Sequence, residues 1–412
     1  MATRAKRATS AKARGPGAGF AVPGFRAAGI HCGIKAKTRD LALVASDVPA
    51  TVAGVFTTST VVGAPVAWCR ERVKKGVARA LVVNSGVSNV AMGERGKRDN
   101  REVAQLAASA LGVPVEQVMT SATGVIGHPL PMAKLRAGIP AAARELAPEG
   151  LADAALAIRT TDTFTKTALR RVRVDGRSVT VAGMAKGSGM IEPRMATMLA
   201  YVFTDAAVSA PFLRRLVRET ADATFNRLSV DGETSTSDTF LAFANGVAGH
   251  RVLRGARSAG ADAFARAFRE VCESLVRDLA RDGEGATKLV TIDVRGAASD
   301  AQAELAARRI ANSALVKTAL FGRDPNWGRI VQTLGAGRVK LREERMRVKL
   351  CGVPVFANGA ATGAAARRRA WERMGAPDVS IEVDLAAGKA STRMWTCDFS
   401  YDYVRINAEY TT

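Results

Sequence analysis

Gly183-Met-Ala-Lys-Gly-Ser-Gly-Met190 runs directly into Ile191-Glu-Pro-Arg-Met-Ala-Thr197-Met-Leu199, and this stretch is the most specific guide to the fold that the chain offers. Three glycines and a lysine within eight residues could be taken for a phosphate-binding loop. The stretch lacks the GxxxxGK[ST] spacing of such a loop, however, so another explanation for its glycines is needed.

Further clusters of glycine, hydroxyl and acidic residues lie on both sides of this stretch, and they read as neither core nor ordinary turns. They are Thr120-Ser-Ala-Thr-Gly-Val-Ile-Gly127, Arg227-Leu-Ser-Val-Asp-Gly-Glu-Thr-Ser-Thr-Ser-Asp-Thr239, Asp282-Gly-Glu-Gly-Ala-Thr-Lys288, Gly322-Arg-Asp-Pro-Asn-Trp-Gly-Arg329 and Tyr403-Val-Arg-Ile-Asn-Ala-Glu-Tyr-Thr-Thr412. Each has a structural explanation when taken singly. Ser229–Thr239 could be a run of side-chain-capped turns, and Gly322–Arg329 fits turn chemistry around Asp324-Pro325.

Composition indicates a globular protein of a reducing compartment. The 412 residues (43.3 kDa) are enough for two or three domains. No stretch approaches the roughly 18 uninterrupted apolar residues that a membrane span requires. The five cysteines are odd in number and scattered, with no CxxC pair, which argues against disulfides and zinc sites. With only three histidines, a metal site or a histidine-based triad is not expected. We therefore predict a cytoplasmic protein without a membrane anchor or a metal.

The net charge of +22 would by itself suggest a nucleic-acid partner. Part of the charge is local, because residues 1–19 carry several Lys and Arg among Ala, Gly and Ser but no acidic residue. Such a tail cannot bury apolar surface and is expected to be disordered. The remaining charge is spread over predicted helices such as Ala364–Arg373, without interleaved aromatic residues. We expect no nucleic-acid partner, and a non-catalytic protein that binds anionic partners remains as an alternative.

The coarse secondary structure alternates between strands and helices, which indicates an α/β or α+β class with much antiparallel sheet. A hairpin is predicted at Arg171–Val174 and Ser178–Ala182, joined by Asp175-Gly176. The other predicted strands are Leu41–Ser46, Ala80–Asn84, Lys288–Val294, Val379–Leu385 and Asp398–Asn407. The predicted helices are Asn100–Leu111, Ser209–Asn226, Ala259–Asp282 and Ala301–Phe321.

Taken together and in this order, the clusters resemble the ornithine acetyltransferase family, also called glutamate N-acetyltransferases. The resemblance runs from Val22 to Thr412. Its most specific elements are Lys186-Gly-Ser-Gly-Met-Ile191 with Met195-Ala-Thr-Met-Leu199, followed by Ser229-Val-Asp-Gly-Glu-Thr-Ser-Thr236, Asp324-Pro-Asn-Trp-Gly-Arg329 and Tyr403–Tyr410. It implies a layered α/β sandwich that resembles the N-terminal-nucleophile hydrolases with different connectivity, plus a smaller C-terminal α/β domain.

The implied organisation follows a self-cleavage between Ala196 and Thr197, where family members cut themselves. After the disordered tail 1–19, residues 20–196 form an alpha chain that carries the N-terminal part of the catalytic sandwich. Residues 197–285 complete the sandwich as part of a beta chain and carry the nucleophile. Residues 286–412 form the C-terminal domain, whose end returns to the active site. Two alpha and two beta chains are expected to assemble as a heterotetramer.

The chemistry of the cut can be rebuilt from the residues. A hydroxyl on the residue after a scissile carbonyl can attack that carbonyl, convert the amide to an ester and leave water to complete the cleavage. The new chain then begins at Thr197, whose α-amine has an unperturbed pKa of about 7.7–8.0. That amine can take the proton of the threonine's own Oγ at neutral pH, which makes Thr197 an activated nucleophile. A helix cap or a core hydroxyl is the structural alternative for this residue.

The family's remaining functional positions carry over onto this sequence one by one. Acyl transfer needs donors for a tetrahedral oxyanion, and the resemblance assigns them to the Thr123 hydroxyl and the Gly124 N–H. The implied substrate contacts are Thr160, Lys186, Thr197, Glu284, Asn407 and Thr412. Lys186 suits an α-carboxylate and Glu284 the side-chain ammonium of ornithine, whereas a structural ion pair is the alternative for both.

The implied reaction is ping-pong: N2-acetylornithine gives its acetyl group to Thr197, and glutamate then accepts it, which recycles the acetyl group in arginine biosynthesis. No cofactor is implied. Some members also use acetyl-CoA, which would then be a substrate. A threonine-nucleophile aminopeptidase or amidase of the same fold is the alternative function. The chain departs from the family at Val87-Ser88, usually Asn-Ala, and at Glu192 and Arg194, usually Ala and Asn, and the last two lie close to the cut.

Overall fold

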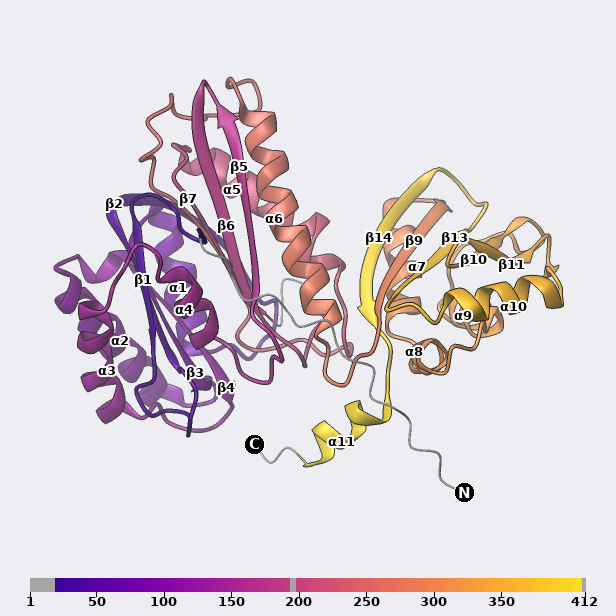
Figure 1. Cartoon of the computed structure of the whole chain (residues 1–412), viewed down its shortest axis with the longest axis horizontal. Coiled ribbons are helices and arrows are strands. Elements are labelled where there is room, and N and C mark those ends of the chain that lie inside the picture. The colour runs from indigo at the N-terminus through magenta and orange to yellow at the C-terminus, as the bar shows by residue number, and fades with distance from the viewer. Residues whose placement is uncertain (1–18, 193–197, 410–412) are drawn as a thin grey trace.

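The computed structural model describes residues 19–192 and 198–409, which form two β-sheets with their helices (Figure 1). The first sheet has eight strands in the order β4-β3-β2-β8-β7-β6-β5, with β1 added beside β2. Its strands are β1 (Phe25–Ile30), β2 (Leu41–Phe56), β3 (Val77–Val87), β4 (Val118–Val125), β5 (Lys166–Val174), β6 (Arg177–Lys186), β7 (Leu199–Thr204) and β8 (Thr239–Ala244). Neighbours are antiparallel except for β3 with β4 and β7 with β8.

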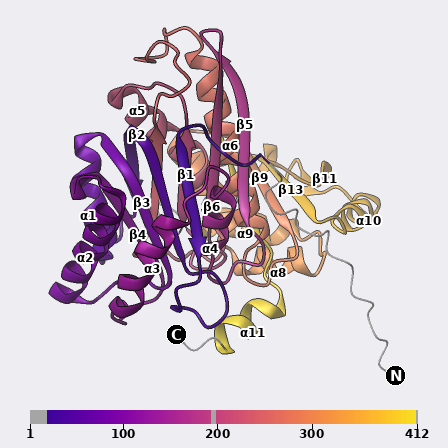
Figure 2. The same ribbon diagram turned by 60° about the vertical axis from the view of Figure 1, so that its left-hand side comes forward.

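The long strand β2 joins the two halves of this sheet. Its first part pairs with β3, its last part (Thr51–Phe56) pairs with β8, and the register shifts between Ala45 and Ala50. Such an irregularity bends and twists a strand. The bend lets β2 belong to a half made of β1–β4 and to a half made of β5–β8, which Figures 1 and 2 show side by side.

The central strands are buried on both faces, which explains their continuous apolar sequences. In β8, Phe240 and Ala242 belong to one core, whereas Leu241 and Phe243 belong to another. The second of these cores lies between the two halves of the sheet, where Phe203 stacks on Phe243 at 5.3 Å between ring centroids.

Helices cover the outer faces and complete the layers (Figure 2). One outer core joins α2 and α3 to β2 and β3, and the other joins α5 and α6 to β5–β8. The helices of this part are α1 (Ala64–Arg72), α2 (Gly93–Leu111), α3 (Met132–Arg144), α4 (Leu151–Ala157), α5 (Ala210–Ala223) and α6 (Ala261–Arg281). The predicted layered α/β sandwich is therefore confirmed.

The second sheet has six strands in the order β12-β11-β10-β13-β9-β14 and a core of its own. We call residues 289–397 the second domain. Its strands are β9 (Leu289–Ala297), β10 (Arg347–Leu350), β11 (Val353–Ala357), β12 (Ala360–Ala361), β13 (Asp378–Asp384) and β14 (Ala390–Cys397). Its helices are α7 (Asp300–Ala311), α8 (Ala314–Phe321), α9 (Trp327–Ala336) and α10 (Ala364–Arg373). Short 3-10 turns lie at Val73–Lys75, Val115–Gln117, Phe225–Arg227 and Glu343–Arg345.

Two predicted elements were wrong. The segment Asp398–Asn407 is not a strand, because Tyr401–Glu409 forms helix α11, which leaves the second domain and lies beneath the first sheet (Figure 1). Its alternating apolar residues imitate a strand, yet Tyr401 and Val404 are largely exposed. The predicted helix Ala301–Phe321 is two helices, since the Ser313 side chain accepts the Val316 N–H and starts α8 as an N-cap.

The other predicted elements are all present and most of their bounds agree to within a few residues, but β2 continues ten residues beyond Ser46 and α2 begins seven residues before Asn100. The hairpin is β5–β6, and Ser209 and Pro211 begin α5 as expected. Gly322–Arg329 is turn and capping structure, because the Asn326 side chain accepts the Arg329 N–H at the start of α9.

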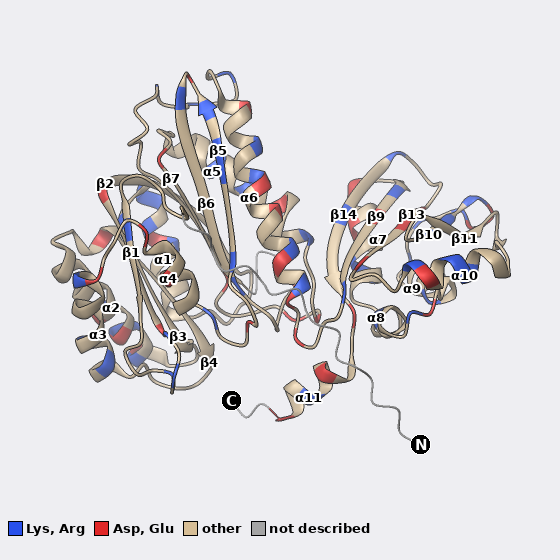
Figure 3. Cartoon of the chain, in the orientation of Figure 1, with Lys and Arg blue, Asp and Glu red and all other residues tan. Residues whose placement is uncertain are grey.

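Lys and Arg are distributed over both parts of the chain among Asp and Glu (Figure 3). The predicted disorder of the tail concerns residues that lie, except for Gly19, outside the described part. Across residues 19–192 and 198–409, no helix combines the length and the apolar character that a membrane span needs.

Candidate active site

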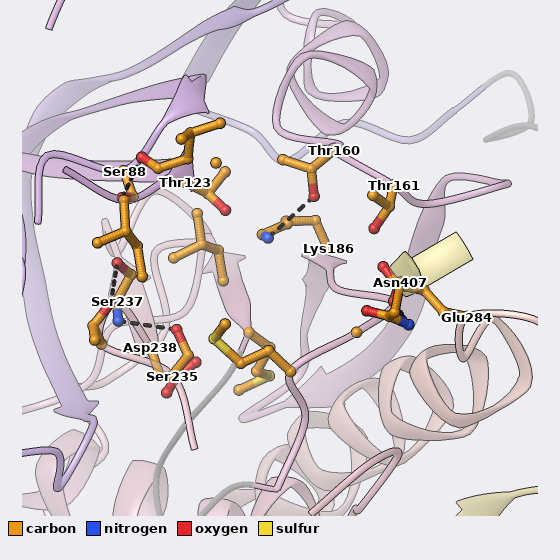
Figure 4. Close-up of a pocket in the computed structure, with 18 residues that line it drawn as sticks. Ser88, Thr123, Thr160, Thr161, Lys186, Ser235, Ser237, Asp238, Glu284 and Asn407 are labelled. Atoms are coloured by element: carbon orange, nitrogen blue, oxygen red, sulfur yellow. Dashed lines mark hydrogen bonds between the residues drawn. The ribbon is translucent and has the colours of Figure 1, made fainter. Parts of the chain in front are cut away.

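A cavity of about 210 Å³ lies where several strands and loops of the first sheet end (Figure 4). Six of the residues predicted for the active site line it: Thr123, Gly124, Thr160, Lys186, Glu284 and Asn407. They come from the end of β4, the loop after α4, the end of β6, the loop after α6, and α11. Ala196, Thr197 and Thr412 lie outside the described residues. Met198, the residue bonded to Thr197, lines the same cavity.

The end of β4 is shaped by a close backbone approach. Gly124 has a φ of +128°, a conformation that favours glycine. A Cβ on Gly124 would lie 2.2 Å from the carbonyl carbon of Gly86 at the end of the neighbouring strand β3. Only glycine therefore fits here, and Thr123 before it is buried with its hydroxyl facing the cavity (Figure 4).

Lys186 presents its ammonium group to the cavity. Its Nζ lies 3.4 Å from the Thr160 Oγ1, and no described carboxylate lies within 4 Å of it. Burial lowers the pKa of Lys186, while the charges of Asp162, Asp238 and Glu284 act in the opposite direction. A cation that is partly desolvated but not paired directly can bind an anionic group of a ligand.

Lys186 is positioned by a buried ionic cluster behind it. The Lys166 Nζ lies 2.6 Å from the Asp162 Oδ1 and 2.5 Å from the Asp282 Oδ2, and all three side chains are buried. Asp162 also accepts the Gly187 N–H at 2.7 Å and the Thr160 N–H at 3.0 Å. Gly187 follows Lys186 in the chain, and Thr160 is the hydrogen-bond partner of the Lys186 ammonium group. The Asp162 carboxylate therefore fixes both the backbone next to Lys186 and the residue that its side chain contacts.

The charges of this cluster determine the protonation of Asp162. Burial alone would raise the pKa of its carboxyl, but the charges of Lys166 and Lys186 and the Gly187 N–H outweigh burial and lower that pKa. Asp162 therefore remains a carboxylate over the physiological range.

Glu284 lies at another side of the cavity and is held by two neighbours. A Cβ on Gly189 would lie 2.4 Å from the Glu284 Oε2, so glycine is needed for the carboxylate to lie there. The Asn407 Nδ2 donates to the same oxygen at 3.1 Å. Helix α11 brings Asn407 to this position. In the same helix the Tyr403 backbone approaches Gly285 so closely that a Cβ on Gly285 would lie 2.4 Å from the Tyr403 nitrogen.

Asp238, for which the sequence predicted no role, also lines the cavity. Asp238 is 3% exposed, and its Oδ2 has no hydrogen-bond partner among the described residues. Burial raises the pKa of its carboxyl well above the ordinary value, although the Lys186 charge acts against this shift. Its place near the end of the Ser229–Thr239 cluster was the signal that the sequence offered. Ser88, Ser235 and Ser237 line the same side.

The Asp162 cluster yields a prediction on stability. In Asp162→Asn, Lys166 keeps only Asp282 and its charge is incompletely compensated, so the free energy of unfolding at pH 7 should fall by about 3–5 kcal/mol. An unfolded aspartate has a pKa of about 3.9, and the folded-state pKa of Asp162 lies below it. The stabilisation is therefore present above the unfolded pKa and is lost as the pH falls toward the folded pKa.

Urea unfolding of wild type and variant between pH 7 and pH 3 measures this difference, which should shrink below about pH 4. Asp378→Asn, which removes a half-exposed ion pair with Arg281, is the control and should change stability little. A difference that stays constant across the pH range would contradict the assignment.

Comparisons with known proteins agree with the motifs. The model of the ArgJ family matches residues 26–412. The arginine biosynthesis bifunctional protein ArgJ of Symbiobacterium thermophilum is 48% identical over 400 residues, covering 94% of this chain and 97% of the relative. The protein of the same name from Geobacter sulfurreducens is 45% identical over 392 residues, covering 95% of this chain and all of the relative.

A solved structure agrees as well. The crystal structure of the arginine biosynthesis bifunctional protein argJ from Bacillus halodurans is 38% identical with a TM-score of 0.50, covering 52% of this chain and 100% of the solved one. The family indicated by the sequence motifs is thereby confirmed. This chain belongs to the ArgJ family.

Proposed function

We propose that this chain transfers the acetyl group of N2-acetyl-L-ornithine to L-glutamate through an acetyl ester on Thr197. The observation that carries the proposal is the cavity, which gathers six predicted site residues from five separate segments beside Met198. The names of its relatives, arginine biosynthesis bifunctional proteins, agree with a role in that pathway.

The nucleophile would be produced by a cut between Ala196 and Thr197. The Thr197 Oγ attacks the Ala196 carbonyl carbon, the peptide C–N bond breaks, and the nitrogen takes up the hydroxyl proton to become the free α-amine of Thr197. Water then hydrolyses the resulting ester, which leaves a carboxylate on Ala196 and a free hydroxyl and α-amine on Thr197. The sheet supports a stable cut product, because β7 and β8 come after the cut but lie between β2 and β6, which come before it.

Acetyl transfer would use the same hydroxyl twice. In the first half-reaction Thr197 Oγ attacks the acetyl carbonyl, the amide C–N bond breaks, and ornithine leaves with the hydroxyl proton on its amine. In the second, the α-amine of glutamate attacks the ester and the proton returns to Oγ. The Thr123 hydroxyl and the Gly124 N–H would stabilise the oxyanion of each step.

The charged residues of the cavity would select the substrates. Lys186 would bind the α-carboxylate that both amino acids share, and Glu284 would bind the distal ammonium of ornithine. Thr160, Asn407 and Thr412 would contribute uncharged hydrogen bonds. No cofactor is required, and acetyl-CoA would enter only as a second acetyl donor. The two kinds of chain would assemble as a heterotetramer of two alpha and two beta chains in the cytoplasm.

The cut predicts two fragments on a denaturing gel, residues 1–196 and 197–412, that copurify as one folded unit. Thr197→Ala should stay whole and lack transferase activity, because the nucleophile of both steps is gone. An intact 43.3 kDa band from active wild type would contradict the cut. Release of acetate from acetylornithine in the absence of glutamate, at the rate of transfer, would favour the amidase alternative.

The oxyanion assignment predicts that Thr123→Ala lowers kcat by roughly 10²–10³ and changes KM little, because the hydroxyl would act on the transition state. Thr123→Ser keeps the hydroxyl and should retain most of the activity. Steady-state kinetics on the cut enzyme measure both. An unchanged kcat in Thr123→Ala would remove Thr123 from the mechanism.

Because Glu284 is proposed to bind the distal ammonium of ornithine, Glu284→Gln should affect the rates of the two half-reactions unequally. The amide keeps the shape but removes the charge, so acetylation of Thr197 by acetylornithine should slow roughly tenfold, the difference between a charged and a neutral hydrogen bond. Deacylation by glutamate should suffer less, since its distal group is a carboxylate. Mass spectrometry of the acetylated fragment follows each half-reaction. Glu270→Gln, in an exposed pair with Arg170, is the control. Equal losses in both steps would give Glu284 a structural role only.

A further inference from the structure

Helix α11 reaches the cavity although all of its residues, Tyr401–Glu409, are exposed or half-buried. Tyr401 and Val404 are 84% and 67% exposed, so burial of apolar surface contributes little to the position of the helix. Its Asn407 nevertheless lies against Glu284 at the edge of the cavity, with the Asn407 Nδ2 3.1 Å from the Glu284 Oε2 (Figure 4). The position of α11 therefore depends on polar contacts at its start.

The chain between β14 and α11 is fixed at its first residue, Asp398. The Asp398 carboxylate is buried and accepts the Thr287 N–H at 2.8 Å and the Lys288 N–H at 3.0 Å. From α8, the Lys317 Nζ donates to the Cys397 carbonyl at 2.5 Å. The chain thus leaves the second domain from a defined point, beside the segment that follows Glu284.

The hydroxyl of Ser400 makes the last contact before the helix, and it has two partners. Its Oγ donates to the Gly285 carbonyl at 2.5 Å and accepts the Asp402 N–H at 3.1 Å. The bond from Asp402 is the kind that an N-cap makes, and it supports the start of α11 at Tyr401. The bond to Gly285 joins this start to the residue that follows Glu284. Ser400 is only 8% exposed, so water is a poor substitute for either bond.

The backbone of Glu284 is held from the other side. Its N–H donates to the Ser188 carbonyl at 2.9 Å, which ties it to the loop after β6. Asn407 lies about two helical turns after Ser400 and therefore on the same face of α11. The hydroxyl of Ser400 and the amide of Asn407 thus contact two neighbouring residues, Gly285 and Glu284, from one helix face.

We infer that Ser400 is a positioning residue for the Glu284 carboxylate, and that through it the second domain sets the selectivity of the cavity for a donor with a distal ammonium group. The inference rests on the proposed function, in which Glu284 binds that ammonium. A charge-assisted hydrogen bond is strong only at a suitable distance and angle. Ser400 holds α11 where Asn407 can orient the Glu284 Oε2, so it acts through Glu284 and not on the substrate itself.

The test compares two acetyl donors on the cut enzyme. N2-acetylornithine carries the distal ammonium, whereas N2-acetylnorvaline has the same carbon chain without it. Ser400→Ala should lower kcat/KM for acetylornithine roughly five- to tenfold, the effect of one hydrogen bond, and leave that for acetylnorvaline within about twofold of wild type. A loss of general stability would lower both.

A double variant shows whether Ser400 acts through Glu284. In the Glu284→Gln background, Ser400→Ala should reduce kcat/KM for acetylornithine by less than about twofold, because the charge that Ser400 positions is already gone. Thr362→Val is the matched control. It removes a hydroxyl bond to the Pro354 carbonyl within the second domain and should behave as wild type with both donors.

Equal losses for the two donors in Ser400→Ala, no loss for acetylornithine, or additive effects in the double variant would each overturn the positioning role of Ser400 and leave the proposed function intact. A wild-type enzyme that used both donors equally well would instead overturn the binding of the distal ammonium by Glu284, and the inference with it. The two failures are therefore distinguishable.

Discussion

Lys166 is completely buried, and its ammonium group is neutralised by Asp162 and Asp282 at hydrogen-bond distance. Asp162 and Lys166 lie four residues apart, in the loop after α4 and at the start of β5, whereas Asp282 follows α6, so the cluster joins two segments that are 116 residues apart. A buried charge is tolerated only when such partners remain in place. The segments therefore cannot separate without leaving a charge uncompensated, and the residues that follow each of them are held in the same way. Asp162 accepts the N–H of Thr160 and the N–H of Gly187, next to Lys186, and Glu284 follows the cluster residue Asp282 by two positions.

The cavity is lined both by strand ends that the sheet holds in place and by a helix that comes back to the first sheet after the second domain. Thr123 and Lys186 lie near the ends of β4 and β6, where the sheet fixes the backbone, whereas Asn407 reaches the cavity from a helix that follows the second domain. Two glycines allow the close contacts that bring these elements together around the cavity. Gly124 and Gly189 are located where the backbone of Gly86 or the carboxylate of Glu284 would collide with a Cβ. Gly189, one of the glycines that looked like a phosphate loop in the sequence, thus permits close packing against a carboxylate.

Much of the sheet could be predicted because its signals are local, whereas the cavity residues could be predicted only through the resemblance of their motifs to a known family. Strand and helix periodicity, the Asp175-Gly176 turn and the Pro211 helix start depend on neighbouring residues only. The helix at Tyr401–Glu409 could not be predicted, because alternating apolar residues do not reveal that no strand lies beside them. Asp238 was missed for a related reason. An aspartate among serines and threonines is typical of an exposed turn, and only the tertiary structure shows that it is buried.

The departures of this chain from its family also acquire a physical meaning only in three dimensions. A glutamate at position 192 looks unfavourable in sequence, because it adds charge beside a predicted scissile bond. The structure gives that charge a partner in Arg308, 116 residues away, with a second carboxylate, Glu304, on the far side of the guanidinium. Ser88 is likewise a departure, and its hydroxyl donates to the Val125 carbonyl at the edge of the cavity. Both substitutions satisfy their polar atoms within the protein, and for this reason they are compatible with an otherwise apolar interior.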